Sequence, residues 1–124
     1  MKPHWLDRRL GSLGPYLTLC LSHDEFTAVM SHLGSKEVPH WCRKDAAVHT
    51  FDHADGGVCC VVCLGDTSAR SGVEIAGLLV HEAVHVWQAW CDDVGEREPG
   101  CEQEAYGVQA IAQELMAEYA RRKA

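Results

Sequence analysis

The sequence contains no apolar run of the roughly 18 residues that a helix needs to cross a bilayer. Its first residues, MKPHWLDRRLGSLG, show neither a long apolar segment nor a cleavage site of small residues, so we expect no secretory signal. Basic residues are in the minority, because 11 Lys and Arg stand against 18 Asp and Glu, a net charge of −7. Such a charge repels phosphate backbones and argues against a nucleic-acid partner. We expect a cytoplasmic protein without a membrane segment.

Repeats, low-complexity tracts and linkers are missing as well, so we expect a single domain over residues 1–124. Cysteine, by contrast, is abundant, with seven residues. Without an export signal, reduced thiols are expected rather than disulfides. Cys60 and Cys63 form a C-x-x-C pair, but residues three apart on a strand point to opposite faces. The second pair that a zinc ribbon needs is also missing, so we interpret these cysteines as small buried hydrophobes.

Hydrophobic periodicity and capping signals predict an α+β chain in the order β-α-β-β-α-α. A short strand is expected at 16–21, followed by a helix with Ser22 as N-cap and Glu25 at its third position. Gly34 ends that helix. Two strands within 46–64 then flank a hairpin turn at 54–57.

The second half of the chain is predicted to be helical. A capping box from Ser71 to Glu74 opens a helix that runs to about Cys91, and after the polar loop 92–100 a last helix runs from about Pro99 towards Arg122. The middle helix is apolar around most of its circumference, which marks it as central. Its two tryptophans, 87 and 90, are expected to be core anchors whose indole N–H groups have partners.

That central helix includes LLVHEAVHVWQAW, which carries His81, Glu82 and His85 among apolar neighbours. Buried ionisable groups are destabilising unless a partner, a hydrogen bond or a metal compensates them. Residues i and i+4 lie one turn apart on one face of a helix, so His81 and His85 can direct two imidazoles at a single zinc ion. Glu82, about 100° around the helix from His81, can reach a water on that zinc as a general base. The H-E-x-x-H pattern therefore predicts a catalytic zinc site.

A catalytic zinc takes a third protein ligand and keeps its fourth position for water. We expect Glu104 to supply it, because Glu104 begins an apolar stripe that continues along the last helix to Leu115. Its carboxylate would then face the core, where a metal would account for it. Glu102, on the polar side of the same helix, is the less favoured alternative. The predicted metal ligands are thus His81, His85 and Glu104.

The run His81-Glu82-Ala83-Val84-His85, followed by Glu104-Ala105 on the next helix, resembles the gluzincin class of zinc metallopeptidases. The compact chain is similar to small peptidase-like proteins of phages and prophages. The resemblance covers roughly residues 57–115 and implies a minimal zincin-like fold, in which a small mixed strand layer (β-α-β-β) precedes two packed helices that carry the metal site.

The resemblance also implies an activity: zinc-dependent hydrolysis of a peptide or protein substrate, in the cytoplasm of a bacterial host if a phage encodes the chain. Zn²⁺ would be held by the three predicted ligands, and Glu82 would be the catalytic base on a zinc-bound water. The strand Val58–Leu64 is the candidate edge along which an extended substrate adds. Its apolar character on both sides is in tension with that role.

The sequence departs from the family at one position. Many relatives place an aspartate four residues after the third ligand, where it orients a zinc-bound histidine, and this chain has Val108 there. A partner for the histidines is expected on physical grounds, but none is assigned. The candidates for stabilising the oxyanion are Tyr106, His49 and His53.

The alternative function is a zinc-stabilised protein-binding module without catalysis. A structural zinc site is closed by a fourth protein ligand, which Cys42 or Cys101 could supply. Glu82 separates the two functions, because a purely structural site has no need of a general base.

Overall fold

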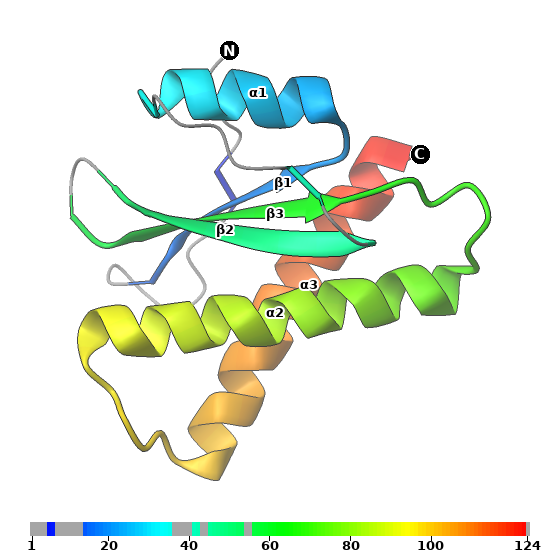
Figure 1. Cartoon of the computed structure of the whole chain (residues 1–124). Coiled ribbons are helices and arrows are strands. Elements are labelled where there is room, and N and C mark those ends of the chain that lie inside the picture. Colours follow the sequence, from blue (N-terminus) through cyan, green and yellow to red (C-terminus); the bar gives the residue numbers. More distant parts are fainter. Residues whose placement is uncertain (1–4, 7–13, 36–40, 43–44, 54–55, 124) are drawn as a thin grey trace.

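The computed structural model describes residues 5–6, 14–35, 41–42, 45–53 and 56–123. Within this part, the chain forms a three-stranded sheet and three helices, which confirms the α+β class (Figure 1). In chain order the elements are β1 (Tyr16–Cys20), α1 (His23–His32), β2 (Ala46–Asp52), β3 (Val58–Leu64), α2 (Gly72–Val94) and α3 (Cys101–Lys123). The predicted turn residues Ala54 and Asp55 lie outside the described residues. None of the described helices combines the length and apolar character of a membrane span.

The sheet has the strand order β1-β3-β2, with β1 parallel and β2 antiparallel to β3. All seven residues of β3 are buried, as the unbroken apolar run predicted. The central position of this strand overturns one expectation. Val58–Leu64 cannot be the edge along which a substrate adds, because neighbouring strands already occupy both of its sides.

The two outer strands of the sheet are β1 and β2, and other parts of the chain contact the outer edge of β1. On β1, the N–H of Leu6 donates to the Leu17 carbonyl at 2.8 Å, and the Arg122 guanidinium donates to the Leu19 carbonyl at 3.5 Å. Arg122 is held there by an ion pair with Glu25 of α1. The edge of β1 is thus occupied by the chain's own groups, and β2 carries the other edge of the sheet.

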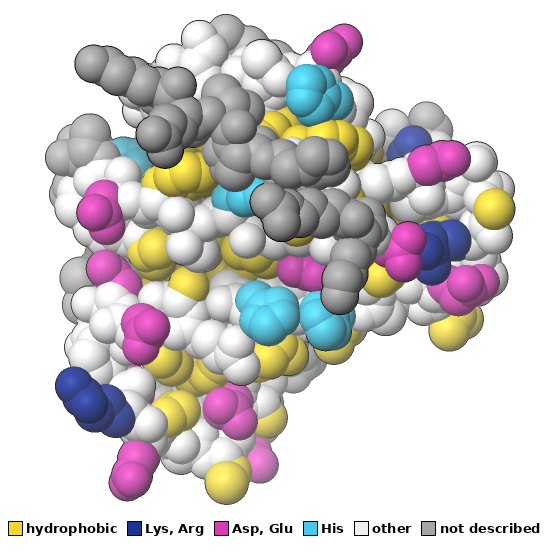
Figure 2. Space-filling view, viewed as in Figure 1, with side chains coloured by type: hydrophobic (Ala, Val, Ile, Leu, Met, Phe, Trp, Pro, Cys, Tyr) yellow, Lys and Arg dark blue, Asp and Glu magenta, His cyan; other side chains and the backbone are white. Residues whose placement is uncertain are grey.

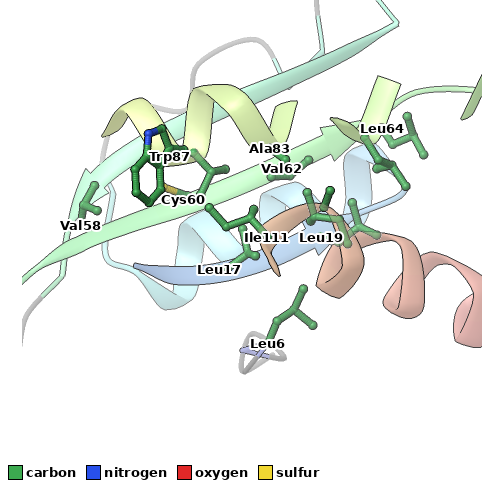
Figure 3. Close-up of a cluster of buried hydrophobic side chains, with 14 of the residues drawn as sticks. Leu6, Leu17, Leu19, Val58, Cys60, Val62, Leu64, Ala83, Trp87 and Ile111 are labelled. Atoms are coloured by element: carbon green, nitrogen blue, oxygen red, sulfur yellow. The ribbon is translucent and has the colours of Figure 1, made fainter. Parts of the chain in front are cut away.

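Helices cover both faces of the sheet, α1 on one face and α2 with α3 on the other (Figure 1). Alternate residues of β3 belong to two separate clusters of buried side chains. Cys60 belongs to the larger cluster under α2 and α3, drawn in Figure 3. Cys63 belongs to the smaller cluster under α1, together with Phe26 and Met30. The two cysteines of the C-x-x-C pair therefore point to opposite faces, as predicted, and cannot share a metal.

The seven cysteines are all free thiols, and five of them are buried. Burial raises the pKa of Cys59 to about 12 and, with smaller effects of Cys59 and Asp93, that of Cys60 to about 12. A hydrogen bond with Cys20, followed by burial, raises the pKa of Cys63 as well. Because the thiolate is the reactive species, these groups are chemically inert in the folded state.

We therefore expect only two of the seven thiols to react with Ellman's reagent at pH 8 without denaturant. The exposed Cys101 should react quickly and the half-buried Cys42 more slowly, whereas the five buried thiols should react only in guanidinium. Mass spectrometry after alkylation assigns the sites. Rapid labelling of Cys59, Cys60 or Cys63 in the native protein would contradict the packing of β3.

Helix α2 has well-defined caps at both ends. At its start, the Ser71 hydroxyl accepts from the Glu74 N–H at 3.2 Å and the Glu74 carboxylate accepts from the Ser71 N–H at 3.1 Å, so the predicted capping box is present. At its end, Gly95 adopts the left-handed conformation, with φ of 75°. The helix continues past the predicted end near Cys91 to Val94, because the glycine cap follows there.

The crossing of α2 and α3 depends on the absence of one side chain. A Cβ atom built on Gly107 would lie 2.2 Å from an atom of the Trp87 ring, so the glycine lets the two helices approach closely. Trp87 is a core anchor, as predicted, with 2% of its surface exposed. The expectation for its indole N–H is wrong, because Nε1 is buried and has no hydrogen-bond partner among the described residues. At this position, close packing of the ring against α3 takes precedence over a hydrogen bond from the indole N–H.

Candidate metal centre

His81 and His85 lie one turn apart on the same flank of α2, as the i, i+4 spacing predicted. Their ring centroids are 5.0 Å apart and the rings are inclined by 74°. Both side chains are exposed. Neutral imidazoles in this arrangement suit zinc and other divalent transition metals.

Glu82 is buried, with 5% of its surface exposed, although it follows the exposed His81 directly. Its position about 100° around the helix turns it towards the sheet. Burial raises the pKa of the Glu82 carboxyl, while the neighbouring charges of His81 and His85 lower it. Carboxyl groups whose pKa is raised by burial are those that general acid–base catalysis uses.

A hollow of ≈ 440 Å³ separates this flank of α2 from strand β2. On the helix side it is lined by His81, Glu82 and His85. On the strand side it is lined by Ala46, Ala47, Val48 and Thr50. Figure 2 shows the same face, with two histidines side by side over α2 and apolar side chains around them. The three residues of the motif thus face one shared space beside the edge of the sheet.

Within the described part of the chain, the backbone of β2 beside this hollow has hydrogen-bonding groups that do not pair with β3. Asp45 accepts from the Gly65 N–H at 2.9 Å, and the N–H of His53 donates to Gly57 at 3.0 Å, so the odd-numbered residues between them face β3. Backbone groups alternate in direction along an antiparallel strand. Those of the intervening residues, Ala46, Val48 and Thr50, therefore point away from the sheet, where another extended chain could pair with them.

Glu104 does not face the core as we expected: its side chain is exposed. The buried residues of α3 begin at Gly107, and the start of this helix extends beyond α2 (Figure 1). Burial, followed by the charges of Glu96 and Glu104, raises the pKa of Cys91. Glu104 does not line the hollow that His81, Glu82 and His85 share.

Over the described ranges, no three His, Cys, Asp or Glu side chains come together as a group that could hold a metal ion. His81 and His85 are brought together, and Glu102 and Glu104 are both exposed on α3. The role of Glu104 as the third ligand stays a prediction.

The other residues considered from the sequence do not line the hollow. His49 faces α1, with its ring 4.9 Å from that of Phe26 and its Nε2 atom 3.0 Å from the Trp41 carbonyl. The ring of His53 stacks on Tyr16 at 3.6 Å. The remaining candidates are Tyr106, which is 67% exposed on α3, Cys42, which packs in the α1 cluster, and the exposed Cys101. We assign none of these an oxyanion-stabilising or zinc-closing role.

Two contributors to the site were missed from the sequence. One is strand β2, whose part depends on the strand order and left no local signal. The other is Gln88, whose Oε1 atom lies 3.0 Å from Nδ1 of His85. A residue three positions after a helical histidine lies beside it on the same face, so helical spacing could have indicated this contact.

Comparison with known proteins identifies no relative: no family model matches the chain, and neither the curated proteins nor the solved structures contain a match. The function must therefore follow from the chemistry of the site itself.

Proposed function

We propose that this protein is a minimal zincin-like metallopeptidase, which hydrolyses peptide bonds with zinc. The observation that carries the proposal is the position of the H-E-x-x-H flank of α2: it faces a hollow beside β2, an outer strand of the sheet, with Glu82 buried in the wall. Two imidazoles that suit zinc, a base whose pKa is raised and an outer strand edge would together serve zinc-dependent peptide hydrolysis.

The side chains fit a zinc site in their donor chemistry. His81 and His85 would hold the ion through imidazole nitrogens, and when bound it would polarise the substrate carbonyl and acidify water. Glu82 would accept a proton from the attacking water and then deliver it to the leaving amine. The reduced thiols of this chain suit the cytoplasmic setting that we propose for the enzyme.

The substrate would bind as an extended chain along β2. Backbone groups of Ala46, Val48 and Thr50 offer both donors and acceptors on the open edge, so the main chain of the substrate would supply much of the affinity. The small side chain of Ala46 leaves room for the hollow on the side of β2 that faces α2. Specificity would then depend on substrate side chains that face α2.

Glu104 remains the proposed third ligand. Because its side chain is exposed and does not line the hollow, a shared ion requires the first turns of α3 to move towards the histidines. The connection between the helices contains Gly95 and Gly100, which permit a change of backbone direction there. Metal binding would in that case be coupled to a local rearrangement.

The non-catalytic zinc module remains the second candidate, because the described residues provide only a pair of close ligands. It accounts less well for Glu82. A carboxylate buried beside two histidines contributes nothing to a site that only holds helices together, and its burial is unfavourable.

Metal analysis of the purified protein tests the proposal. We expect one Zn²⁺ per chain, and His81→Ala or His85→Ala should weaken binding by more than about 100-fold, since even partners of metal ligands contribute 10–100-fold. His32→Ala, an exposed histidine of α1, is the matched control and should bind as the wild type does. Glu104→Ala should lose affinity while Glu102→Ala should not. A peptide-library assay should show cleavage that a chelator abolishes.

The outcomes separate the candidates. Wild-type protein that binds no zinc, or binds it equally well without His81 and His85, would refute the metal site. Tight binding without cleavage of any peptide would favour the module. Unchanged zinc affinity in Glu104→Ala would contradict only the assignment of Glu104 as the third ligand.

A further inference from the structure

We infer that Gln88 is a positioning residue for His85, which holds the imidazole in the tautomer that a metal requires. The inference deepens the proposed function and rests on it. It would supply the orienting partner of the histidines that the sequence analysis left unassigned.

The contact with Gln88 favours one tautomer of His85. Oε1 of Gln88 lies 3.0 Å from Nδ1 of His85, and a carbonyl oxygen can only accept a hydrogen bond. With the amide group in this orientation, the proton of a neutral ring lies on Nδ1. A neutral imidazole has one N–H, so its other nitrogen, Nε2, keeps a lone pair for coordination.

The placement of Gln88 favours positioning over contact with substrate. It lies three residues beyond His85 on α2, a continuous 23-residue helix, and does not line the hollow. Its carbonyl therefore reaches His85 from outside the site. Outer partners of this kind fix the orientation of metal-binding histidines and increase their basicity. As a surface pair three residues apart, the same contact stabilises the helix itself only slightly.

The first experiment reads the tautomer directly in the metal-free protein. Long-range ¹H–¹⁵N correlation spectra distinguish a protonated Nδ1 from a protonated Nε2 in His85. At a pH where the ring is neutral, we expect Nδ1–H in the wild type and loss of that preference in Gln88→Met, which keeps the chain length but has no carbonyl. A wild-type ring protonated at Nε2 would overturn the inference, because Gln88 would then be donating through its amide group.

The second experiment measures Zn²⁺ affinity by competition with a chromophoric chelator. Gln88→Met should bind Zn²⁺ about 10–100-fold more weakly than the wild type. Gln88→Glu, whose carboxylate is a stronger acceptor, should restore or exceed wild-type affinity. Gln109→Met, at an exposed glutamine of α3, is the matched control and should leave affinity unchanged. Melting temperatures of all three variants should stay close to that of the wild type.

Each result bears on one claim. Equal affinities for Gln88→Met and Gln109→Met, with zinc bound tightly by both, would overturn the role of Gln88 and leave the proposed metal site intact. Wild-type protein that binds no Zn²⁺ would overturn the proposed function, and the inference would fall with it.

Discussion

Replacement of Glu82 by Gln should abolish peptide hydrolysis while zinc stays bound. The amide has nearly the same shape as the carboxylate but cannot accept a proton, and general acid–base catalysis contributes about 10²–10⁴-fold to such reactions. We therefore expect kcat/KM to fall at least that far, with zinc stoichiometry unchanged. Glu98→Gln, an exposed glutamate in the connection between α2 and α3, is the control and should keep full activity. Wild-type activity in Glu82→Gln would contradict the assignment of Glu82 as the general base.

The same substitution should stabilise the metal-free protein at neutral pH. Burial raises the pKa of Glu82 above its ordinary value of 4.5, so the folded state disfavours the ionised carboxylate. A raised folded pKa means that the group favours folding when protonated, and this contribution is lost as pH rises through the folded pKa. Glutamine does not ionise, so its contribution to folding stability does not fall as pH rises. The melting temperature of Glu82→Gln should exceed that of the wild type at pH 7, and the difference should vanish near pH 4.

Chelator-treated samples are needed for this comparison, since a bound cation would favour the ionised carboxylate and lower its pKa. A variant that is less stable than the wild type at pH 7 would show that the carboxylate has a favourable partner in the folded state. A gain in stability together with a loss of activity would identify Glu82 as a residue retained for chemistry and not for folding.

Gly107→Ala should destabilise the fold by about 2 kcal/mol, in spite of the higher helix propensity of alanine. The added methyl would stand 2.2 Å from the Trp87 ring, which is buried and packed against its neighbours and cannot move aside. For a chain of this size, we expect a fall of the melting temperature of about 8 °C, measured by circular dichroism.

Gly77→Ala is the matched control for this prediction. Gly77 lies within α2, is exposed, and has no atom within 4 Å of the position that a Cβ would take. The same chemical change should there stabilise the protein, by up to about 1 kcal/mol. Changes of opposite sign in the free energy of unfolding for the two substitutions would support the close crossing of α2 and α3 at Gly107. A neutral or stabilising Gly107→Ala would show that the helices are further apart.

The secondary structure followed from local signals, and these were largely sufficient. Ser22 and Ser71 cap the helices that they were predicted to open, and the C-x-x-C cysteines point to opposite faces of a strand. Hydrogen bonds at helix caps and the alternation of a strand involve residues close together in the chain. They are therefore present in the sequence as short patterns.

Other features required the assembled structure. The unbroken apolar run at Val58–Leu64 indicated burial on both faces, but whether such a strand is central or at an edge depends on its partners. The outward direction of Glu104 depends on how far α3 extends past α2. The close contact of Gly107 with Trp87 joins residues on two helices whose crossing no local pattern describes.

The sequence by itself placed His81, Glu82 and His85 on neighbouring positions of one helix, because 3.6 residues per turn bring them there whatever the rest of the chain does. Only the tertiary structure decided that their flank opens beside the edge of β2, and that Glu104 is exposed and does not line the same hollow. Strand order and helix crossing result from packing between distant segments, where side-chain volume and close contact prevail over the periodicity of any single element.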